Sequence, residues 1–320
     1  MTNTVVADSG QQMHTKVKLG NTTLNGSARE ELVPSRYALR VGEIDVLVVS
    51  DGVLSLPSAM LGHNADPAIR AAWLEDMFLP PDVFEWALNA VVVRSGGQTV
   101  LIDAGIGMDP GLDLPRAGQL TQRLEAAGIN LASVTDVVLT HLHMDHIGGL
   151  LIDGVKERLR PDLRIHVAAA EVEFWASPDF SHVSMPPGFP DALRRTAKHF
   201  LNEYRRQLRT FETEHEVAPG VVVHRTGGHT PGHSVVRLAS GTDRLTFAGD
   251  AVFQVGFDHP DWYNGFEHDP EEAARVRIRL LRELAASRES LVATHLSFPS
   301  VCHVAVDGDV FRCVPGPWKY

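Results

Sequence analysis

The sequence predicts an α/β protein in which two β-sheets pack against each other and carry helices on their outer faces. Short apolar runs that end in turn residues alternate with amphipathic stretches in two blocks, separated by a helical segment at about residues 171–211. The length of 320 residues suits one large α/β domain or two small ones. Because we find no internal repeat and no interdomain linker, we expect one domain over residues 37–320.

The first block begins at Tyr37, after a polar segment, residues 1–36, that we expect to be a flexible arm. Apolar runs predict strands at 44–50, 89–94, 99–102, 134–139 and 165–168, and helical spacing predicts helices at 67–79 and 120–127. Gly96 and Gly97 separate two of these runs, which predicts a hairpin.

The segment 171–211 is expected to be a helix-loop-helix insertion that supplies a substrate pocket. Its second helix is predicted at 191–210, where apolar residues share one face. The loop at 181–190 is long and rich in proline, and such loops are often functional. The second block then gives strands at 221–224, 234–238, 244–248, 291–293, 301–306 and 310–314, and a helix at 270–287 with Asp269 as its N-cap.

Composition excludes several classes of partner. The formal net charge is −11, from 29 basic and 40 acidic residues, which argues against nucleic acid or an anionic membrane as a partner. Two cysteines make neither a disulfide framework nor a thiolate metal site, although a single disulfide between them stays open. No run reaches transmembrane length, and residues 1–25 lack the apolar core of a signal peptide, so we expect a cytoplasmic protein.

Three histidines and one aspartate fall within six residues, directly after the predicted strand 134–139. His141 and His143 alternate, so a strand end can point both to one side, and the following turn can bring Asp145 and His146 beside them. Imidazole nitrogens and carboxylate oxygens are ligands that Zn²⁺ accepts. A shuffled chain of this composition would show the pattern on the order of a few times in a thousand. Four donors so close together indicate two metals that share one site.

Three later stretches repeat this arrangement of an apolar strand followed by a polar residue. A Gly-His-Thr-Pro-Gly-His loop contains His229 and His233, Asp250 follows the strand 244–248, and His295 follows the strand 291–293. Taken alone, Asp250 or His295 would be read as a cap or a surface residue. In this order, the three stretches indicate the rest of one metal site.

The ordered set of motifs resembles the metallo-β-lactamase superfamily over residues 41–314. The resemblance implies a four-layer αβ/βα sandwich of two mixed β-sheets with outer helices, and two divalent metal ions at the sheet edges. Zinc is the first choice, with manganese, cobalt, iron or nickel as alternatives. The implied ligands are His141, His143 and His229 for the first metal; Asp145, His146 and His295 for the second; and Asp250 as a bridge. Asp103 and His233 are implied to support these ligands from outside the coordination sphere.

Shorter motifs narrow the resemblance. Ser297-Phe298-Pro299, Phe174-Trp175 and Ser50-Asp51-Gly52 are similar to methyl parathion hydrolase and its relatives. N-acyl-homoserine lactonases share the seven ligands but carry a tyrosine three residues after the bridging aspartate, where this chain has Phe253. This difference weakens the homoserine-lactonase interpretation.

The resemblance implies a hydrolase whose metal-bridging hydroxide cleaves an ester, a lactone or a phosphotriester in a small, largely apolar substrate. Asp145 and Asp250 would be its catalytic carboxylates, with Asp145 passing a proton to the leaving group. We expect the pocket walls to include Trp175, Phe180, Met185, Phe189 and Phe253, although these could be core residues instead. The alternative is a non-hydrolytic member, either a mono-iron oxidoreductase or a metal-binding module. Relatives are often dimers, so a homodimer is expected as well.

Overall fold

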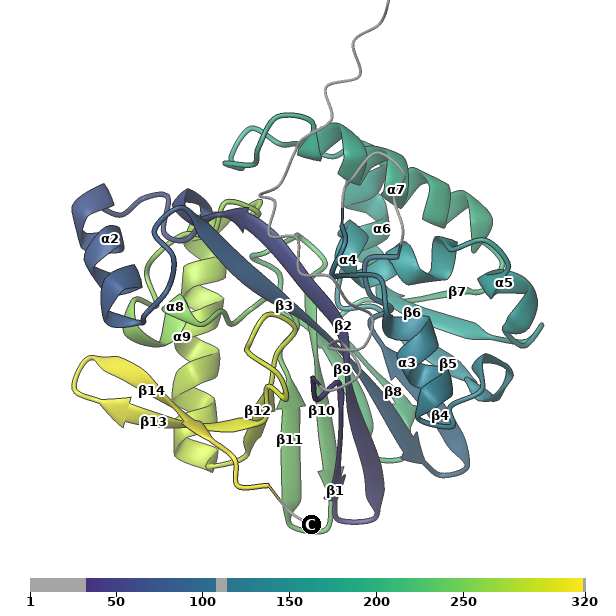
Figure 1. Ribbon diagram of the computed structural model, residues 1–320. Helices are drawn as coiled ribbons and strands as arrows, with labels where there is room; N and C mark the ends of the chain where they lie inside the picture. The colour runs from purple at the N-terminus through teal and green to yellow at the C-terminus, as the bar shows by residue number, and fades with distance from the viewer. Residues whose placement is uncertain (1–32, 108–113, 319–320) are drawn as a thin grey trace, which may run out of the picture.

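Two seven-stranded β-sheets form the middle of the molecule (Figure 1). The structure is a computed structural model that describes residues 33–107 and 114–318. The predicted arm at 1–36 therefore lies outside the described residues, apart from 33–36, of which Arg36 already begins a strand. The mixed sheets and their outer helices confirm the fold class predicted from the sequence.

The first sheet holds its seven strands in chain order. Its first four strands are antiparallel, and the last four, from β4 onward, are parallel to one another. Parallel neighbours end at the same edge of a sheet, so the loops after β4 and β5 begin side by side. The strands are β1 (Arg36–Val41), β2 (Ile44–Pro57), β3 (Val83–Ser95), β4 (Gln98–Ile102), β5 (Asp136–Val138), β6 (Arg164–Ala168) and β7 (Leu208–Phe211).

The second sheet is antiparallel except where β11 pairs in parallel with β12. That parallel pair again puts two strand ends, and the residues that follow them, at one edge. Its strands are β8 (Glu214–Ala218), β9 (Val221–Arg225), β10 (Ser234–Ser240), β11 (Asp243–Phe247), β12 (Ser290–Val292), β13 (Cys302–Asp307) and β14 (Val310–Pro315). Cys302 and Cys313, on β13 and β14, are free thiols.

Helices cover the outer faces of both sheets (Figure 1). In the figure, α3 to α7 lie on one side of the sheets and α9 on the other. None of the helices in the described residues is both long and apolar enough to cross a membrane. The helices are α2 (Pro67–Asp76), α3 (Leu120–Ala126), α4 (Met144–Ile147), α5 (Val155–Arg158), α6 (Ala169–Ala176), α7 (Phe189–Glu203), α8 (Val255–Asp258) and α9 (Pro270–Ser287), with 3-10 turns at Ser58–Met60, Leu131–Ser133 and Gly148–Leu151.

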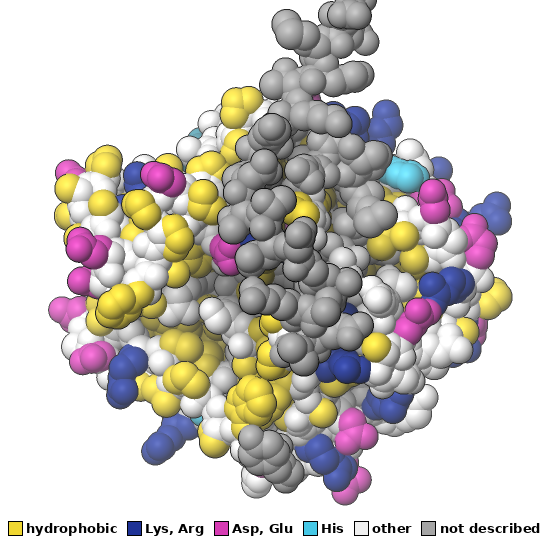
Figure 2. Space-filling view, in the orientation of Figure 1, with side chains coloured by type: hydrophobic (Ala, Val, Ile, Leu, Met, Phe, Trp, Pro, Cys, Tyr) yellow, Lys and Arg dark blue, Asp and Glu magenta, His cyan; other side chains and the backbone are white. Residues whose placement is uncertain are grey.

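Three apolar clusters hold these layers together. One lies between the first sheet and its helices, one between the two sheets, and one between the second sheet and α9. Along β3, Val91 and Val93 face the second sheet, whereas Ala90 and Val92 face the helices. A strand buried on both faces reads as a continuous apolar run, which is why the run at 89–94 predicted the second half of β3. The strand begins six residues earlier, at Val83, where buried and less buried residues alternate. On the visible face, acidic and basic side chains are interspersed (Figure 2).

The structure corrects two predicted elements. The strand predicted at 44–50 continues to Pro57, because a β-bulge between Ser50 and Gly52 bends β2 without ending its pairing with β3. The helix predicted at 191–210 ends at Glu203. Residues 208–211 instead form β7, the edge strand of the first sheet, where pairing with β6 overrides the helical spacing. The insertion at 171–211 is therefore two helices and a strand.

Asp136 ties three neighbouring strands of the first sheet together. Its buried carboxylate accepts hydrogen bonds from Gln98 Nε2 (3.1 Å), Arg164 Nη2 (2.9 Å) and His166 Nε2 (2.8 Å). Burial opposes ionisation, but the hydrogen bonds from His166, Arg164 and Gln98 outweigh it and hold the pKa of Asp136 well below its ordinary value. The carboxylate therefore stabilises the sheet in its charged form.

We predict that Asp136→Asn lowers the free energy of unfolding by about 1–3 kcal/mol at pH 7. Because the pKa is depressed in the folded state, this stabilisation is present above the unfolded-state pKa of about 4 and fades as the pH falls below it. Urea unfolding at pH 7 and at pH 3.5 should show the difference between wild type and variant shrink in acid. Asp45→Asn is the control, because the carboxylate of Asp45 forms an exposed ion pair with Arg40, and it should have little effect at either pH.

Candidate metal centre

The seven predicted ligands come together at one edge of the sandwich, where strand ends from both sheets meet. Donor atoms of His141, His143, His229 and Asp250 lie within 4.8 Å of one another, and so do those of Asp145, His146 and His295. The loop after β5 and the short helix α4 supply four of these side chains, the β9–β10 loop supplies one, and the ends of β11 and β12 supply one each. The fold thus brings together residues that lie up to 154 positions apart in the sequence (295 − 141).

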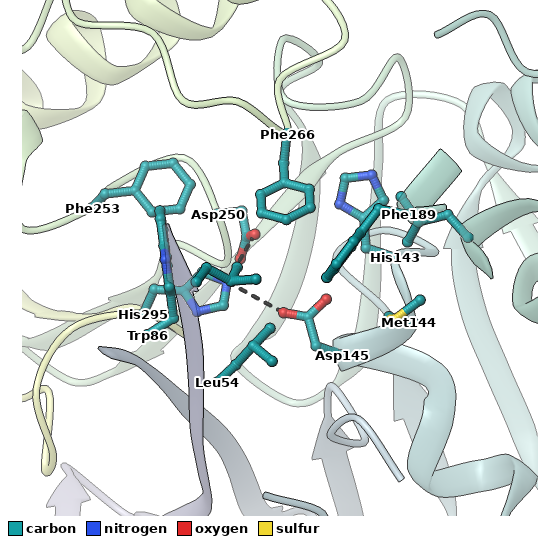
Figure 3. Close-up of a pocket in the computed structure, with 12 residues that line it drawn as sticks. Leu54, Trp86, His143, Met144, Asp145, Phe189, Asp250, Phe253, Phe266 and His295 are labelled. Carbon is teal, nitrogen blue, oxygen red and sulfur yellow. Dashed lines mark hydrogen bonds and ion pairs between the residues drawn. The ribbon is translucent and has the colours of Figure 1, made fainter. Parts of the chain in front are cut away.

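Asp250 is the centre of the arrangement. Its Oδ2 lies 3.0 Å from His295 Nε2, 3.3 Å from His229 Nε2 and 3.9 Å from His141 Nε2. Its Oδ1 lies 3.3 Å from His146 Nε2. One carboxylate therefore faces side chains of both donor groups, which is the position that a bridging ligand needs. Figure 3 shows Asp250 and Asp145 directed toward His295.

Outer hydrogen bonds fix the orientation of three imidazoles. His146 Nδ1 donates to Asp103 Oδ2 (2.7 Å), and His295 Nδ1 donates to the carbonyl of Ala87 (2.8 Å). His141 Nδ1 lies 3.0 Å from the hydroxyl of Thr140, which itself donates to Asp103. With Nδ1 engaged, each ring turns its Nε2 toward Asp250. The structure thus brings Asp103 to the supporting position that the resemblance implied.

His233 contacts the backbone of the bridging residue and lies outside the two donor groups. Its Nε2 accepts the N–H of Asp250 (3.1 Å), and its Nδ1 lies 2.8 Å from Thr226 Oγ1. A nitrogen that accepts this hydrogen bond has no lone pair left for a cation. The contact also requires Gly249, whose φ is +52° and where a Cβ would lie 2.9 Å from His233 Nε2.

The chemistry of the donor set fits a pair of cations. His141 Nε2, His146 Nε2 and Asp250 Oδ1 are buried and have no hydrogen-bond partner among the described residues. Buried polar atoms are nearly always paired, so unpartnered atoms that converge on one point indicate a ligand. Nitrogen and oxygen donors in this number suit Zn²⁺ and the other borderline divalent ions.

The local field favours the ionised form of Asp250, and it shifts the pKa values of the histidines in opposite directions. Burial lowers the pKa values of His141, His143 and His229 well below the ordinary value. Burial also opposes charge on His146, but the carboxylates of Asp250, Asp103 and Asp145 raise its pKa well above the ordinary value. Burial acts against ionisation of Asp250 as well, and His295, His146 and His229 outweigh it and hold the pKa of that carboxyl well below its ordinary value.

Glu171 is a buried residue that sequence reasoning missed. Its Oε1 accepts from the N–H of Leu142 (2.9 Å) and from Trp175 Nε1 (2.8 Å). Its Oε2 accepts from the hydroxyl of Thr230 (2.6 Å) and the N–H of Gly232 (3.0 Å). Burial raises the pKa of Glu171, whereas these four donors favour its ionised form. One carboxylate thus joins α6 to both loops that carry the histidines. Its apolar neighbours in the sequence were the only available hint of burial.

An apolar pocket opens onto the two donor groups (Figure 3). The empty space in this region is about 400 Å³, a volume that includes open solvent. Of the predicted wall residues, Phe189 and Phe253 line it. Trp175, Phe180 and Met185 are not among its lining residues: Trp175 belongs to the core cluster of the first sheet, and Phe180 and Met185 pack against that cluster. The sequence interpretation did not include several residues of the wall, namely Leu54, Leu56, Met144, Leu193 and Phe266.

Comparisons with known proteins find related sequences and folds. A model of the metallo-β-lactamase superfamily matches residues 84–295. A protein named "probable metallo-hydrolase" from Mycobacterium tuberculosis is 24% identical over 193 residues, which cover 52% of this chain and 57% of the relative. The chain thus spans little more than half the length of the curated relatives that head the comparison.

Two solved structures share the fold. AidC, a dizinc quorum-quenching lactonase in complex with the product N-hexanoyl-L-homoserine, superposes with a TM-score of 0.82 at 23% identity, over 89% of this chain and 99% of AidC. The hydrolase AbOPH of the β-lactamase superfamily superposes with a TM-score of 0.79 at 24% identity, over 90% of this chain and 99% of AbOPH. At these identities, the likeness shows the fold alone.

We predict that Glu171→Gln lowers the free energy of unfolding by about 1–3 kcal/mol, because an amide nitrogen would face two of the four donors. Thermal melts should show a fall of several degrees. Glu173→Gln makes the same change on the exposed face of α6 and should leave the melting temperature within a degree. Equal melting temperatures for Glu171→Gln and wild type would show that the carboxylate does not join the loops.

Proposed function

The chain belongs to the metallo-β-lactamase superfamily, and on that premise we propose that it is a hydrolase that cleaves an ester, lactone or phosphotriester bond in a small, largely apolar substrate. The observation that carries the proposal is the position of Asp250 at the end of an apolar pocket, where its carboxylate faces His141 and His229 of one donor group and His146 and His295 of the other. A site for a single cation would not need a carboxylate between two sets of donors.

In this proposal, two divalent cations, zinc in the first instance, bind at the two donor groups. His141, His143 and His229 would hold one cation, Asp145, His146 and His295 would hold the other, and Asp250 would be shared between them. When bound, such cations lower the pKa of water toward about 7 and polarise a carbonyl or phosphoryl oxygen. The residues of the chain then have to bind the substrate, exclude bulk water and move one proton.

We assign the proton transfer to Asp145. Its carboxylate lines the pocket, and its Oδ2 lies 3.5 Å from His146 Nε2 and 3.4 Å from His295 Nε2. Its side chain keeps 13% of its surface accessible, against 4% for that of Asp250. Of the two carboxylates, Asp145 is therefore the one that a leaving group can reach.

The pocket favours an apolar substrate of modest size. Trp86 and Phe253 meet edge to face at 5.3 Å, and Phe253 stacks on His295 at 5.7 Å. Phe253 offers no hydroxyl to a substrate carbonyl, so binding there depends on shape and apolar contact. This wall supports apolar esters and phosphotriesters at least as well as acyl-homoserine lactones, in line with the resemblance to methyl parathion hydrolase and its relatives.

We also propose that residues 37–320 form one domain and that the insertion at 171–211 supplies one pocket wall. Phe189 and Leu193, both on α7, line the pocket and support this role. The cytoplasmic location and the homodimer expected from the sequence stay predictions.

We predict that the purified wild-type protein holds two metal equivalents per chain and hydrolyses p-nitrophenyl acetate, a lactone or methyl parathion. His141→Ala should lower metal content and reduce hydrolysis at least about a hundredfold, because it removes a buried ligand at the sheet edge. Metal analysis by mass spectrometry, initial rates and far-UV circular dichroism check the prediction. His199→Ala, on the exposed face of α7, is the matched control and should behave as wild type.

Full activity in His141→Ala would contradict the assignment of the site. A wild-type protein that binds a single iron and consumes oxygen would overturn the hydrolase proposal in favour of oxidoreductase chemistry.

We predict further that kcat/KM rises along a series of p-nitrophenyl esters from acetate to hexanoate, by up to about fourfold for each methylene that the pocket buries, which corresponds to about 0.8 kcal/mol. Leu54→Phe, which narrows the pocket, should abolish the gain for the longer esters and spare acetate. Ile69→Phe, on the exposed side of α2, is the control for added bulk. A flat series in the wild-type protein would contradict the apolar pocket.

A further inference from the structure

A buried histidine outside the seven predicted ligands contacts one of them. His268 precedes α9 and exposes 8% of its surface. Its Nε2 lies 3.3 Å from His143 Nε2, and its Nδ1 lies 3.0 Å from the carbonyl oxygen of Asp179. Its backbone N–H donates to the carbonyl of His229 (2.8 Å), so the residue is tied to two members of the first donor group.

The chemistry of the partners sets the direction of this hydrogen-bond chain. A carbonyl oxygen can only accept, so Nδ1 of His268 carries a proton. Aromatic rings surround the imidazole, with Phe174 at 4.8 Å, Phe180 at 5.0 Å and Trp175 at 6.2 Å between ring centroids. Such surroundings favour the neutral ring, whose Nε2 is then an acceptor. The proton between the two rings therefore belongs to His143 Nε2.

This direction determines which nitrogen of His143 is free. With its proton on Nε2, the ring has its lone pair on Nδ1, which lies 3.1 Å from His229 Nε2. His141, His146 and His295 instead direct Nε2 toward Asp250. His143 thus has the opposite ring orientation, with Nδ1 directed into the donor group and Nε2 directed at His268.

We propose that His268 is a positioning residue of the metal centre: it accepts the Nε2–H of His143 and so keeps the lone pair of His143 Nδ1 directed at the cation shared with His141 and His229. The proposal rests on the proposed function, since it concerns the same centre. It also gives the aromatic residues 174, 175 and 180 a role, which is to hold the imidazole of His268 between Asp179 and His143.

The test compares two substitutions of His268. His268→Phe keeps an aromatic ring of similar size and removes the acceptor, whereas His268→Gln keeps an oxygen that can accept from His143. We expect His268→Phe to weaken the binding of one Zn²⁺ equivalent about 10- to 100-fold, as measured by competition with a chromogenic chelator, and His268→Gln to weaken it about threefold at most. The second equivalent should bind as in wild type.

His259 provides a matched control on the same segment. Its ring stacks on Trp262 at 3.8 Å, and neither residue belongs to the two donor groups. His259→Phe should therefore leave the binding of both zinc equivalents unchanged. Melting temperatures of the chelator-treated variants report folding separately, and we expect His268→Phe to melt within a few degrees of wild type when the metal is removed.

The outcomes separate this inference from the proposed function. A wild-type protein that binds no zinc overturns both. Two tightly bound equivalents in wild type and equally tight binding in His268→Phe overturn only the role of His268. A loss in His268→Gln as large as that in His268→Phe would show that an acceptor at this position does not preserve zinc binding, which also overturns the role of His268.

Discussion

The carboxylate of Asp250 is the constraint on which the rest of the site depends. It is buried, ionised and within 4 Å of four imidazole nitrogens. A buried charge is expensive unless partners surround it, so the histidines have to approach from several directions at once. Only a fold that ends several strands at one edge can deliver them, and the parallel pairs β4–β5 and β11–β12 do so.

Buried acids add side-chain hydrogen bonds to the backbone hydrogen bonds of the loops that carry the histidines. Asp103 binds the N–H and hydroxyl of Thr140 as well as His146. It adopts a φ of +57°, a conformation that costs free energy in a residue other than glycine and that these three contacts hold in place. Glu171 likewise accepts hydrogen bonds from both loops that carry the histidines, through Leu142, Thr230 and Gly232. These contacts hold the predicted ligands in fixed orientations, and a fixed geometry favours the affinity of a metal site.

The sequence identified the seven side chains that meet at the candidate metal centre more completely than the pocket around them, for a physical reason. Ligand chemistry restricts a position to very few residue types, so His141 and Asp250 remain recognisable in a single sequence. The run at 89–94 was also predictable, because burial on both faces produces a continuous apolar run. The strand β7 and the end of β2 were not, because pairing with a neighbouring strand and a β-bulge leave no local pattern.

The residues that escaped prediction share one property, which is that their partners are distant in the sequence. As an acidic residue, Glu171 would be assigned to the surface. Its hydrogen bonds to Thr230 and Gly232, which explain its burial, appear only in the folded chain. The aromatic residues Trp175 and Phe180 show the converse error. Their aromatic side chains suggested a pocket wall. In the structure, Trp175 donates its indole N–H to Glu171, and both rings lie against the imidazole of His268. An aromatic cluster next to a metal site can thus serve the hydrogen bonds of the ligands as well as the substrate, and only the fold distinguishes the two.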